Sequence, residues 1–190
     1  AFKEGKDVHD ETSKMLGVDR QVGKTLNFCA IYGGHAGKIA KISSCSVDEA
    51  QDFLNVYWDR LPTVRAWIEK QHWKARRDKQ IGTIAGRQIK IDNLFSKDKY
   101  ERLAAERQVV SYMIQGSAAD IMKIAMIKLQ EVGFIGNLTV HDEVDLLRPE
   151  FDYEIDMEVI KETMENCIKL TVPLEVEIGA GKNWSEAKNG

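Results

Sequence analysis

The sequence has few of the residues that mark several classes of protein. Only three of its 190 residues are cysteines, Cys29, Cys45 and Cys167, and their spacing matches no metal or redox motif. A disulfide scaffold is therefore excluded, and we expect reduced thiols. No stretch approaches the roughly 18 uncharged apolar residues of a membrane span, and Ala1–Gly5 lack the apolar region of a signal peptide. We expect no membrane partner and a cytoplasmic location.

The overall composition indicates a folded chain with one large or two small domains. Apolar residues make up 43% of the sequence, charged residues 30% and aromatic residues 8%, which excludes disordered and collagen-like chains. The 27 basic and 30 acidic residues give a net charge of −3. Taken alone, this net charge argues weakly against a nucleic-acid partner.

The charges are unevenly distributed along the chain. Residues 70–90 contain seven basic side chains against one acid, and residues 142–177 contain twelve acids against three bases. Separate basic and acidic regions suit a protein that holds a polyanion with one and a metal ion with the other. Two solvated faces explain the same pattern. The seven basic residues, here called the basic strip, are Lys70, Lys74, Arg76, Arg77, Lys79, Arg87 and Lys90.

The first half of the sequence is mostly helical in its apolar spacing. Ser46 and Glu49 form a capping box for a helix over about 47–60, which ends before Pro62. A second helix is predicted from about 64 to 79. The period then changes, and residues 81–91 alternate around a glycine as a short hairpin.

The next segment predicts two helices with a break between them. The helices cover about Lys99–Ile114 and Ala118–Val132, with Ser117 and Asp120 as the cap of the second and Gly133 as its stop.

The last third mixes strands with one amphipathic helix. Residues 138–146 predict a tight hairpin with His141 and Asp142 at its tip, residues 152–170 a helix, and residues 174–178 a final strand. Helices followed by a small antiparallel sheet with covering helices indicate an α+β fold. We expect two subdomains, 1–98 and 99–190, which part near residues 93–99.

One constellation follows a helical stripe. Arg20, Lys24, Phe28 and Tyr32 are four residues apart, so each advances only about 40° around a helix and all four share one face. Two cations one turn apart suit a triphosphate, and two aromatic rings beyond them suit a sugar and a base. An amphipathic helix with two solvated bases and two core aromatics is the alternative.

The second constellation is the acidic tip of the predicted hairpin. His141, Asp142 and Glu143 lie between two apolar strand segments. Adjacent carboxylates on a rigid turn suit a hard cation such as Mg²⁺, although two-metal phosphoryl transfer needs a further carboxylate from elsewhere. A polar turn that merely links two strands explains the same residues.

Three motifs follow one another along the chain: Arg20-x3-Lys24-x3-Phe28-x3-Tyr32-Gly33, the Gln115–Asp120 segment QGSAAD, and the Val140–Val144 segment VHDEV. In this order they resemble the motifs of family A DNA polymerases of the bacterial DNA polymerase I type. The resemblance covers nearly the whole chain and implies the C-terminal fingers and palm of an incomplete right-hand polymerase. Fingers would correspond to 1–98 and palm to 99–190. A bacterial or phage-infected cell is the expected setting.

The resemblance also implies residue roles. Arg20 and Lys24 would hold the triphosphate of a dNTP, Phe28 would lie against its sugar, and Tyr32 would close the insertion site. Asp142 would be one of two catalytic aspartates that bind two Mg²⁺, with Glu143 and Lys24 assisting the chemistry. Primer-template DNA would be contacted by Arg87, Arg107, Gln115, His141 and Gly33.

The sequence also departs from the family pattern. Ser111 stands where an asparagine is common, and Asp145 where an apolar residue is usual. The other catalytic aspartate of the family lies upstream of Ala1, so we expect the isolated chain to be inactive. We expect it to be completed by an N-terminal fragment or to be an excerpt of a longer protein. The alternative function is a non-catalytic primer-template DNA-binding module.

Overall fold

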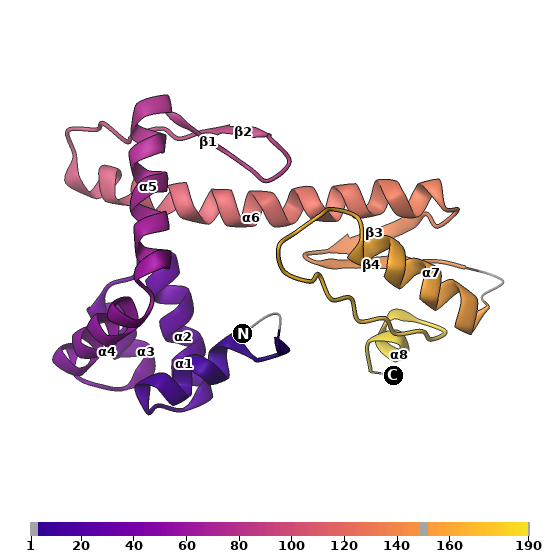
Figure 1. Ribbon diagram of the computed structural model, residues 1–190, viewed down its shortest axis with the longest axis horizontal. Helices are drawn as coiled ribbons and strands as arrows, with labels where there is room; N and C mark the ends of the chain where they lie inside the picture. The colour runs from indigo at the N-terminus through magenta and orange to yellow at the C-terminus, as the bar shows by residue number, and fades with distance from the viewer. Residues whose placement is uncertain (1–3, 149–151, 190) are drawn as a thin grey trace. The chain divides into compact units, whose positions relative to one another are not determined.

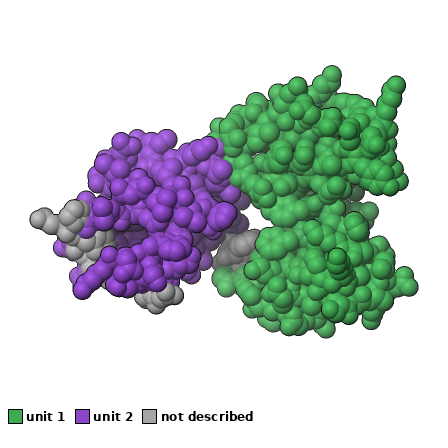
Figure 2. All heavy atoms as spheres, turned by 180° about the vertical axis from the view of Figure 1, so that it is seen from behind, with its two compact units in different colours: residues 1–116 green, residues 117–190 purple. Residues whose placement is uncertain are grey.

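The computed structural model describes residues 4–148 and 152–189. The chain forms two compact units, residues 1–116 and 117–190, which Figure 2 colours separately. The packing boundary falls inside a long helix, whereas the subdomain boundary at 98/99 is a functional assignment and stays a prediction.

The first unit is mainly helical (Figure 1). Its elements are α1 Val8–Leu16, α2 Arg20–Ile31, α3 Ala36–Ser43, α4 Val47–Arg60, α5 Pro62–Asp78, β1 Gln80–Gly82, β2 Gln88–Lys90 and the first half of α6 Lys99–Glu131. The capping box of Ser46 and Glu49 is present at the start of α4. Pro62 opens α5, where its missing N–H costs no helical hydrogen bond. Strands β1 and β2 form the predicted antiparallel hairpin.

Helices α1 to α4 share one hydrophobic core. Leu26 of α2 and Ile39 of α3 are fully buried, and Tyr57 of α4 is 1% exposed. Gly23 lets α1 and α2 approach closely, because a Cβ there would lie 2.9 Å from the carbonyl oxygen of His9. Close packing of α1 on α2 fixes the direction in which the outer face of α2 points.

A second core joins α5, the β1–β2 hairpin and α6. It contains Ala75, Ile81, Ile91, Leu94, Ala105 and Val109.

The predicted break between residues 114 and 118 is wrong, because α6 is continuous from Lys99 to Glu131. Gly116 lies within the helix rather than ending it. A Cβ at this position would lie 3.0 Å from Cγ2 of Thr83 and 3.1 Å from Cδ1 of Ile89. The glycine is therefore explained by close contact with the β1–β2 hairpin. The predicted stop is present, since Gly133 follows the helix with a φ of +91°.

The second unit contains a hairpin covered by helices. Its elements after α6 are β3 Gly136–Val140, β4 Glu143–Leu146, α7 Tyr153–Glu165 and α8 Trp184–Asn189. Strands β3 and β4 are antiparallel with Val140 opposite Glu143, as the sequence predicts. Leu129, Phe134 and Ile160 form the buried core. Together the two units confirm the α+β fold class.

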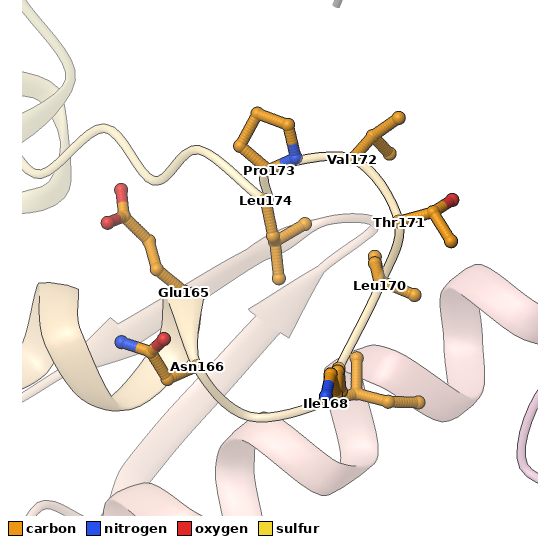
Figure 3. Close-up of a pocket in the computed structure, with 9 residues that line it drawn as sticks. Glu165, Asn166, Ile168, Leu170, Thr171, Val172, Pro173 and Leu174 are labelled. Atoms are coloured by element: carbon orange, nitrogen blue, oxygen red, sulfur yellow. The ribbon is translucent and has the colours of Figure 1, made fainter. Parts of the chain in front are cut away.

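Two predictions for the C-terminal region need correction. Helix α7 ends at Glu165 rather than Leu170, and Asn166 caps it by donating its side-chain N–H to the carbonyl of Glu162 at 2.9 Å. The chain then bends around a pocket lined by residues 165–166 and 168–174 (Figure 3), which include none of the predicted site residues. Residues 174–178 form no strand, because no described strand pairs with them. Across 4–148 and 152–189, no helix is both long and apolar enough to cross a membrane.

Candidate functional site

Helix α2 presents the predicted stripe on its outer face. Arg20 begins the helix and Tyr32 caps its C-terminal end. Phe28 is 47% exposed, and its ring lies parallel to that of Tyr32, with 6.2 Å between centroids. Lys24 is half-buried and makes no ion pair with any described residue. Leu26 and Cys29 on the opposite face are buried, so the aromatic pair is available to a flat ligand.

The two cations of the stripe differ in their environment. Nη2 of Arg20 lies 2.6 Å from Oδ2 of Asp7, and Nε lies 2.9 Å from Oδ1 of Asp10. The hydrogen bond from Arg20 lowers the pKa of Asp7 from 3.8 to about 2. Asp7 also caps α1 by accepting from the backbone N–H groups of His9 and Asp10. Arg20 is therefore tied to α1, whereas the ammonium of Lys24 is free of acidic partners among the described residues.

A buried polar cluster beneath α2 was missed by the sequence reasoning. Oδ1 of Asn27 accepts hydrogen bonds from the hydroxyls of Thr12 and Tyr57, at 3.1 and 3.0 Å. Its Nδ2 lies 3.1 Å from Nδ1 of His9, whose ring centroid is 5.6 Å from that of Phe28. The available signal was an asparagine in a helix interior, where it is unfavourable without partners. This cluster fixes the rotation of α2 and thus the face that carries Phe28.

Gly33 and Arg107, both predicted to contact DNA, lie together. Gly33 has a φ of +71°, and a Cβ there would lie 2.8 Å from Cγ of Arg107. The side chain of Arg107 is exposed on α6 and forms no ion pair with the described residues. The glycine therefore lets the chain after α2 pass directly against the aliphatic part of the Arg107 side chain.

The basic strip is partly neutralised. Arg76 pairs with Glu106, Arg77 with Asp78, and Lys90 with Asp92. Within the described ranges, the exposed bases of the strip without an ion pair include Lys74 and Lys79.

The two remaining DNA-contact predictions of the first unit fall beside each other near Gly116. Nη2 of Arg87 donates to the carbonyl oxygen of Gly116 at 3.0 Å, which holds the β1–β2 loop on α6. Gln115 precedes that glycine and is exposed. Arg87 thus has a structural hydrogen bond in addition to its predicted role.

The hairpin of the second unit exposes Asp142 at its tip. His141 adopts a φ of +57°, which a two-residue turn between paired strands requires. Asp142 is exposed and has no hydrogen-bond or ion-pair partner among the described residues. Glu143, by contrast, accepts a hydrogen bond from Nε1 of Trp184 at 2.6 Å and lies 3.5 Å from Nζ of Lys188. The sequence reasoning missed both partners of Glu143.

The described residues offer single metal-binding side chains and no complete metal site. Residues 4–148 and 152–189 contain no group of three histidine, cysteine or acidic side chains placed to hold one ion. Asp142 offers an exposed carboxylate, a donor that Mg²⁺ accepts together with water and phosphate oxygens. Asp156 is different, because it is 6% exposed and its carboxylate accepts from Nε of Arg148 at 3.0 Å. The acidic region thus includes a structural ion pair as well as an available carboxylate.

The sequence matches the family model described as DNA polymerase family A over residues 1–186. The chain belongs to family A of the DNA polymerases. DNA polymerase I, thermostable, from Thermus aquaticus is 40% identical over 200 residues, which cover 98% of this chain and 24% of that protein. DNA polymerase I from Deinococcus radiodurans is 35% identical over 201 residues, covering 99% of this chain and 21% of that protein.

A solved structure supports the family assignment. The POL domain of Pol1 from M. smegmatis, in complex with DNA primer-template and dNTP, matches with a TM-score of 0.91 and 32% identity. The match covers 99% of this family A chain and 36% of that one. This chain spans about a quarter of the length of the curated relatives named above.

Proposed function

We propose that this chain supplies the nucleotide-binding helix and one catalytic carboxylate of a DNA-directed DNA polymerase. The reaction is template-directed transfer of a nucleotidyl group from a dNTP to a primer 3′ end. The observation that carries the proposal is the outer face of α2, where the unpaired Lys24 is followed by the parallel rings of Phe28 and Tyr32. A relative of this family is described with primer-template and dNTP bound.

The proposed dNTP contacts follow the order of groups along α2. Lys24 holds the triphosphate, and Arg20 joins it if phosphate oxygens displace Asp7 and Asp10. Phe28 lies against the sugar, and Tyr32 closes the site beside the templating base. An ammonium on phosphate oxygens also stabilises the negative charge that develops during transfer, which is the proposed catalytic part of Lys24.

The proposed metal ligand of this chain is Asp142. Its exposed, unpaired carboxylate fits a hard cation. Two-metal transfer requires a second carboxylate, and the described residues contain no group of three His, Cys or acidic side chains that could form the whole site. Two Mg²⁺ ions bound there would stabilise the attacking and leaving oxygens. Glu143 supports the tip, and His141 lies beside the primer end.

Apart from His141, the proposed DNA contacts come from the first unit. Arg107 with Gly33 and the exposed Gln115 contact primer-template near the nascent pair, and Arg87 contacts the duplex. The unpaired lysines of the basic strip add contacts to phosphates that do not depend on sequence.

We propose that an upstream segment, on a partner chain or on the same polypeptide, supplies the second aspartate. The exposure of β3 supports this, since Leu138 is 57% exposed on a two-stranded sheet. A non-catalytic primer-template binding module is the second candidate, and the basic strip favours it. That candidate leaves the unpaired Lys24 and Asp142 without a role.

The test is primer extension with and without an upstream segment of a family A polymerase that contains the missing aspartate strand. We expect no incorporation by the 190-residue chain alone, and Mg²⁺-dependent, templated extension by the completed enzyme. Extension by the chain alone would refute the need for a second carboxylate. A completed complex that binds primer-template but never extends it would favour the binding module.

A further inference from the structure

Helix α8 contacts the acidic tip of the β3–β4 hairpin through two side chains. The indole N–H of Trp184 donates to Oε1 of Glu143 at 2.6 Å, and Nζ of Lys188 lies 3.5 Å from Oε2. The same ammonium lies 4.8 Å from the centroid of the Trp184 ring. Both oxygens of Glu143 are therefore engaged by two side chains that lie one turn apart on α8.

The start of α8 is fixed by its own capping interactions. The side-chain oxygen of Asn183 accepts from the backbone N–H of Glu186 at 3.1 Å. The carboxylate of Glu186 in turn accepts from Nδ2 of Asn183 at 2.7 Å and from the backbone N–H of Lys182 at 3.1 Å. This reciprocal pattern resembles a capping box and stabilises a short helix that would be marginal in isolation.

The segment before α8 is packed tightly against the helix. A Cβ at Gly179 would collide with the backbone carbonyl of Ala187, and one at Gly181 would lie 2.6 Å from the backbone nitrogen of Ala187. Neither glycine has a positive φ. Glycine is therefore needed at both positions because of the close contact with α8, and not because of the backbone conformation. Ile178, just upstream, packs against the core of the second unit. Helix α8 is thus joined to that core by a short path.

We propose that Trp184 and Lys188 are positioning residues that hold Glu143 in place, so that Asp142 alone presents a free carboxylate to the metal. This inference rests on the proposed function. Adjacent carboxylates on one turn compete for the same hard cation. A hydrogen bond and an ion pair to Glu143 remove it from that competition and fix the tip, as outer partners do in metal sites.

The proposal predicts two effects of opposite sign when the contacts of Trp184 and Lys188 with Glu143 are removed. A released Glu143 joins Asp142 in binding the ion, so a divalent cation binds the tip more tightly. The ion then has a ligand that transfer does not use, so primer extension becomes slower. Partial unfolding of the tip would instead weaken cation binding and extension together.

The test uses Trp184→Phe, which keeps a ring but removes the N–H donor, in the polymerase completed by its upstream segment. We expect the extension rate to fall about tenfold and Mn²⁺ affinity, followed by electron paramagnetic resonance, to rise. Trp67→Phe on α5 is the matched control and should change neither. Lys188→Met should shift both quantities in the same directions by less, because its contact with Glu143 is longer, at 3.5 Å against 2.6 Å for Trp184. It carries the test if Trp184→Phe fails to fold.

A double-mutant cycle separates positioning from general support. In a Glu143→Ala background, Trp184→Phe should cause no further loss of rate, whereas additive losses would overturn the proposal. Parallel losses of rate and Mn²⁺ affinity, or an unchanged rate, would also overturn it. If the completed wild-type enzyme does not extend primers, the proposed function fails, and the Mn²⁺ measurement still decides whether α8 restrains Glu143.

Discussion

The outer face of α2 carries two basic side chains, and the β3–β4 tip carries two acidic ones. In each region, one of the two neighbouring charged side chains has polar partners and the other has none among the described residues. Arg20 is tied to Asp7 and Asp10 while Lys24 is unpaired, and Glu143 is tied to α8 while Asp142 is unpaired.

The comparison indicates different roles for the paired and the unpaired charge in each region. A paired charge is held in one position, and an unpaired charge is ready to bind a ligand, since no internal ion pair must be broken first. We therefore expect Lys24 and Asp142 to matter most for the reaction. Their paired neighbours should act mainly by placing them.

Replacing Lys24 should produce the largest effect among the α2 variants. Lys24→Ala removes a charge-assisted contact to the triphosphate, which costs about 2 to 4 kcal/mol of transition-state stabilisation. This corresponds to a fall in kcat/KM for dNTP of about 30- to 1,000-fold. Single-nucleotide incorporation by the completed enzyme measures it, with Lys41→Ala on α3 as the control. An effect no larger than that of the control would remove Lys24 from the nucleotide site.

A smaller effect is expected from adding a hydroxyl to the exposed ring of α2. The wild type should reject dideoxynucleotides, because a sugar without its 3′-OH leaves a polar contact unmade, at about 1 to 3 kcal/mol. In Phe28→Tyr the added phenol replaces that hydroxyl, so discrimination should fall by one to two decades while dNTP use changes little. Competition between ddNTP and dNTP on one primer-template measures the ratio.

The matched control for this experiment is Phe95→Tyr, which adds a phenol to another exposed ring of the first unit. An unmoved ratio in Phe28→Tyr would mean that Phe28 does not face the sugar.

The buried support of α2 should contribute to stability more than to chemistry. Tyr57→Phe removes the hydrogen bond to Asn27 and should lower the free energy of unfolding by about 1 kcal/mol. Burial raises the pKa of Tyr57 to about 12, so its contribution is complete below pH 10 and is lost as pH rises towards 12. Alkaline unfolding curves of Tyr57→Phe should therefore fall less steeply above pH 10. Tyr100→Phe, at an 82% exposed position, should match the wild type.

The sequence predicted elements whose signals are local and missed those that depend on distant contacts. The capping box of α4 and the alternation of the β3–β4 hairpin are local, and both appear in the structure. The break predicted between residues 114 and 118 was wrong, and the contact that explains Gly116 inside the helix is with Thr83, more than thirty positions earlier in the sequence. The alternation of residues 174–178 is real, but a strand also needs a neighbour to accept its hydrogen bonds.

The candidate site shows the same division. Spacing alone places Lys24, Phe28 and Tyr32 on one face of a helix, and the structure has them there. The hydrogen bond from Trp184 to Glu143 joins residues 41 positions apart, and no local sequence pattern predicts it. Partners that restrain a site residue therefore had to come from the structure.

The smallest predicted effect concerns the paired cation of α2. Asp7→Asn keeps the cap of α1 but removes one of the two carboxylate charges that hold Arg20, and the charge of Asp10 remains. The pKa of Asp7 lies below its ordinary value, so its ion pair stabilises the fold above about pH 4, and this contribution is lost as pH falls towards 2. Thermal unfolding should show a modest loss in Asp7→Asn near neutral pH that shrinks in acid. Asp19→Asn, at the cap of α2, serves as the control, and an equal loss at every pH would contradict the prediction.

The most direct test of the division of work is Asp142→Ala in the completed polymerase, measured for both primer-template affinity and extension. Asp142 belongs to the second unit and the basic strip to the first. Because Asp142 is not one of the basic side chains proposed to hold the duplex, we predict that extension is abolished while duplex affinity stays nearly unchanged. Glu158→Ala, which removes an exposed carboxylate of α7, should leave both intact. Parallel losses of affinity and extension in Asp142→Ala would mean that Asp142 has a structural role, and would contradict the account.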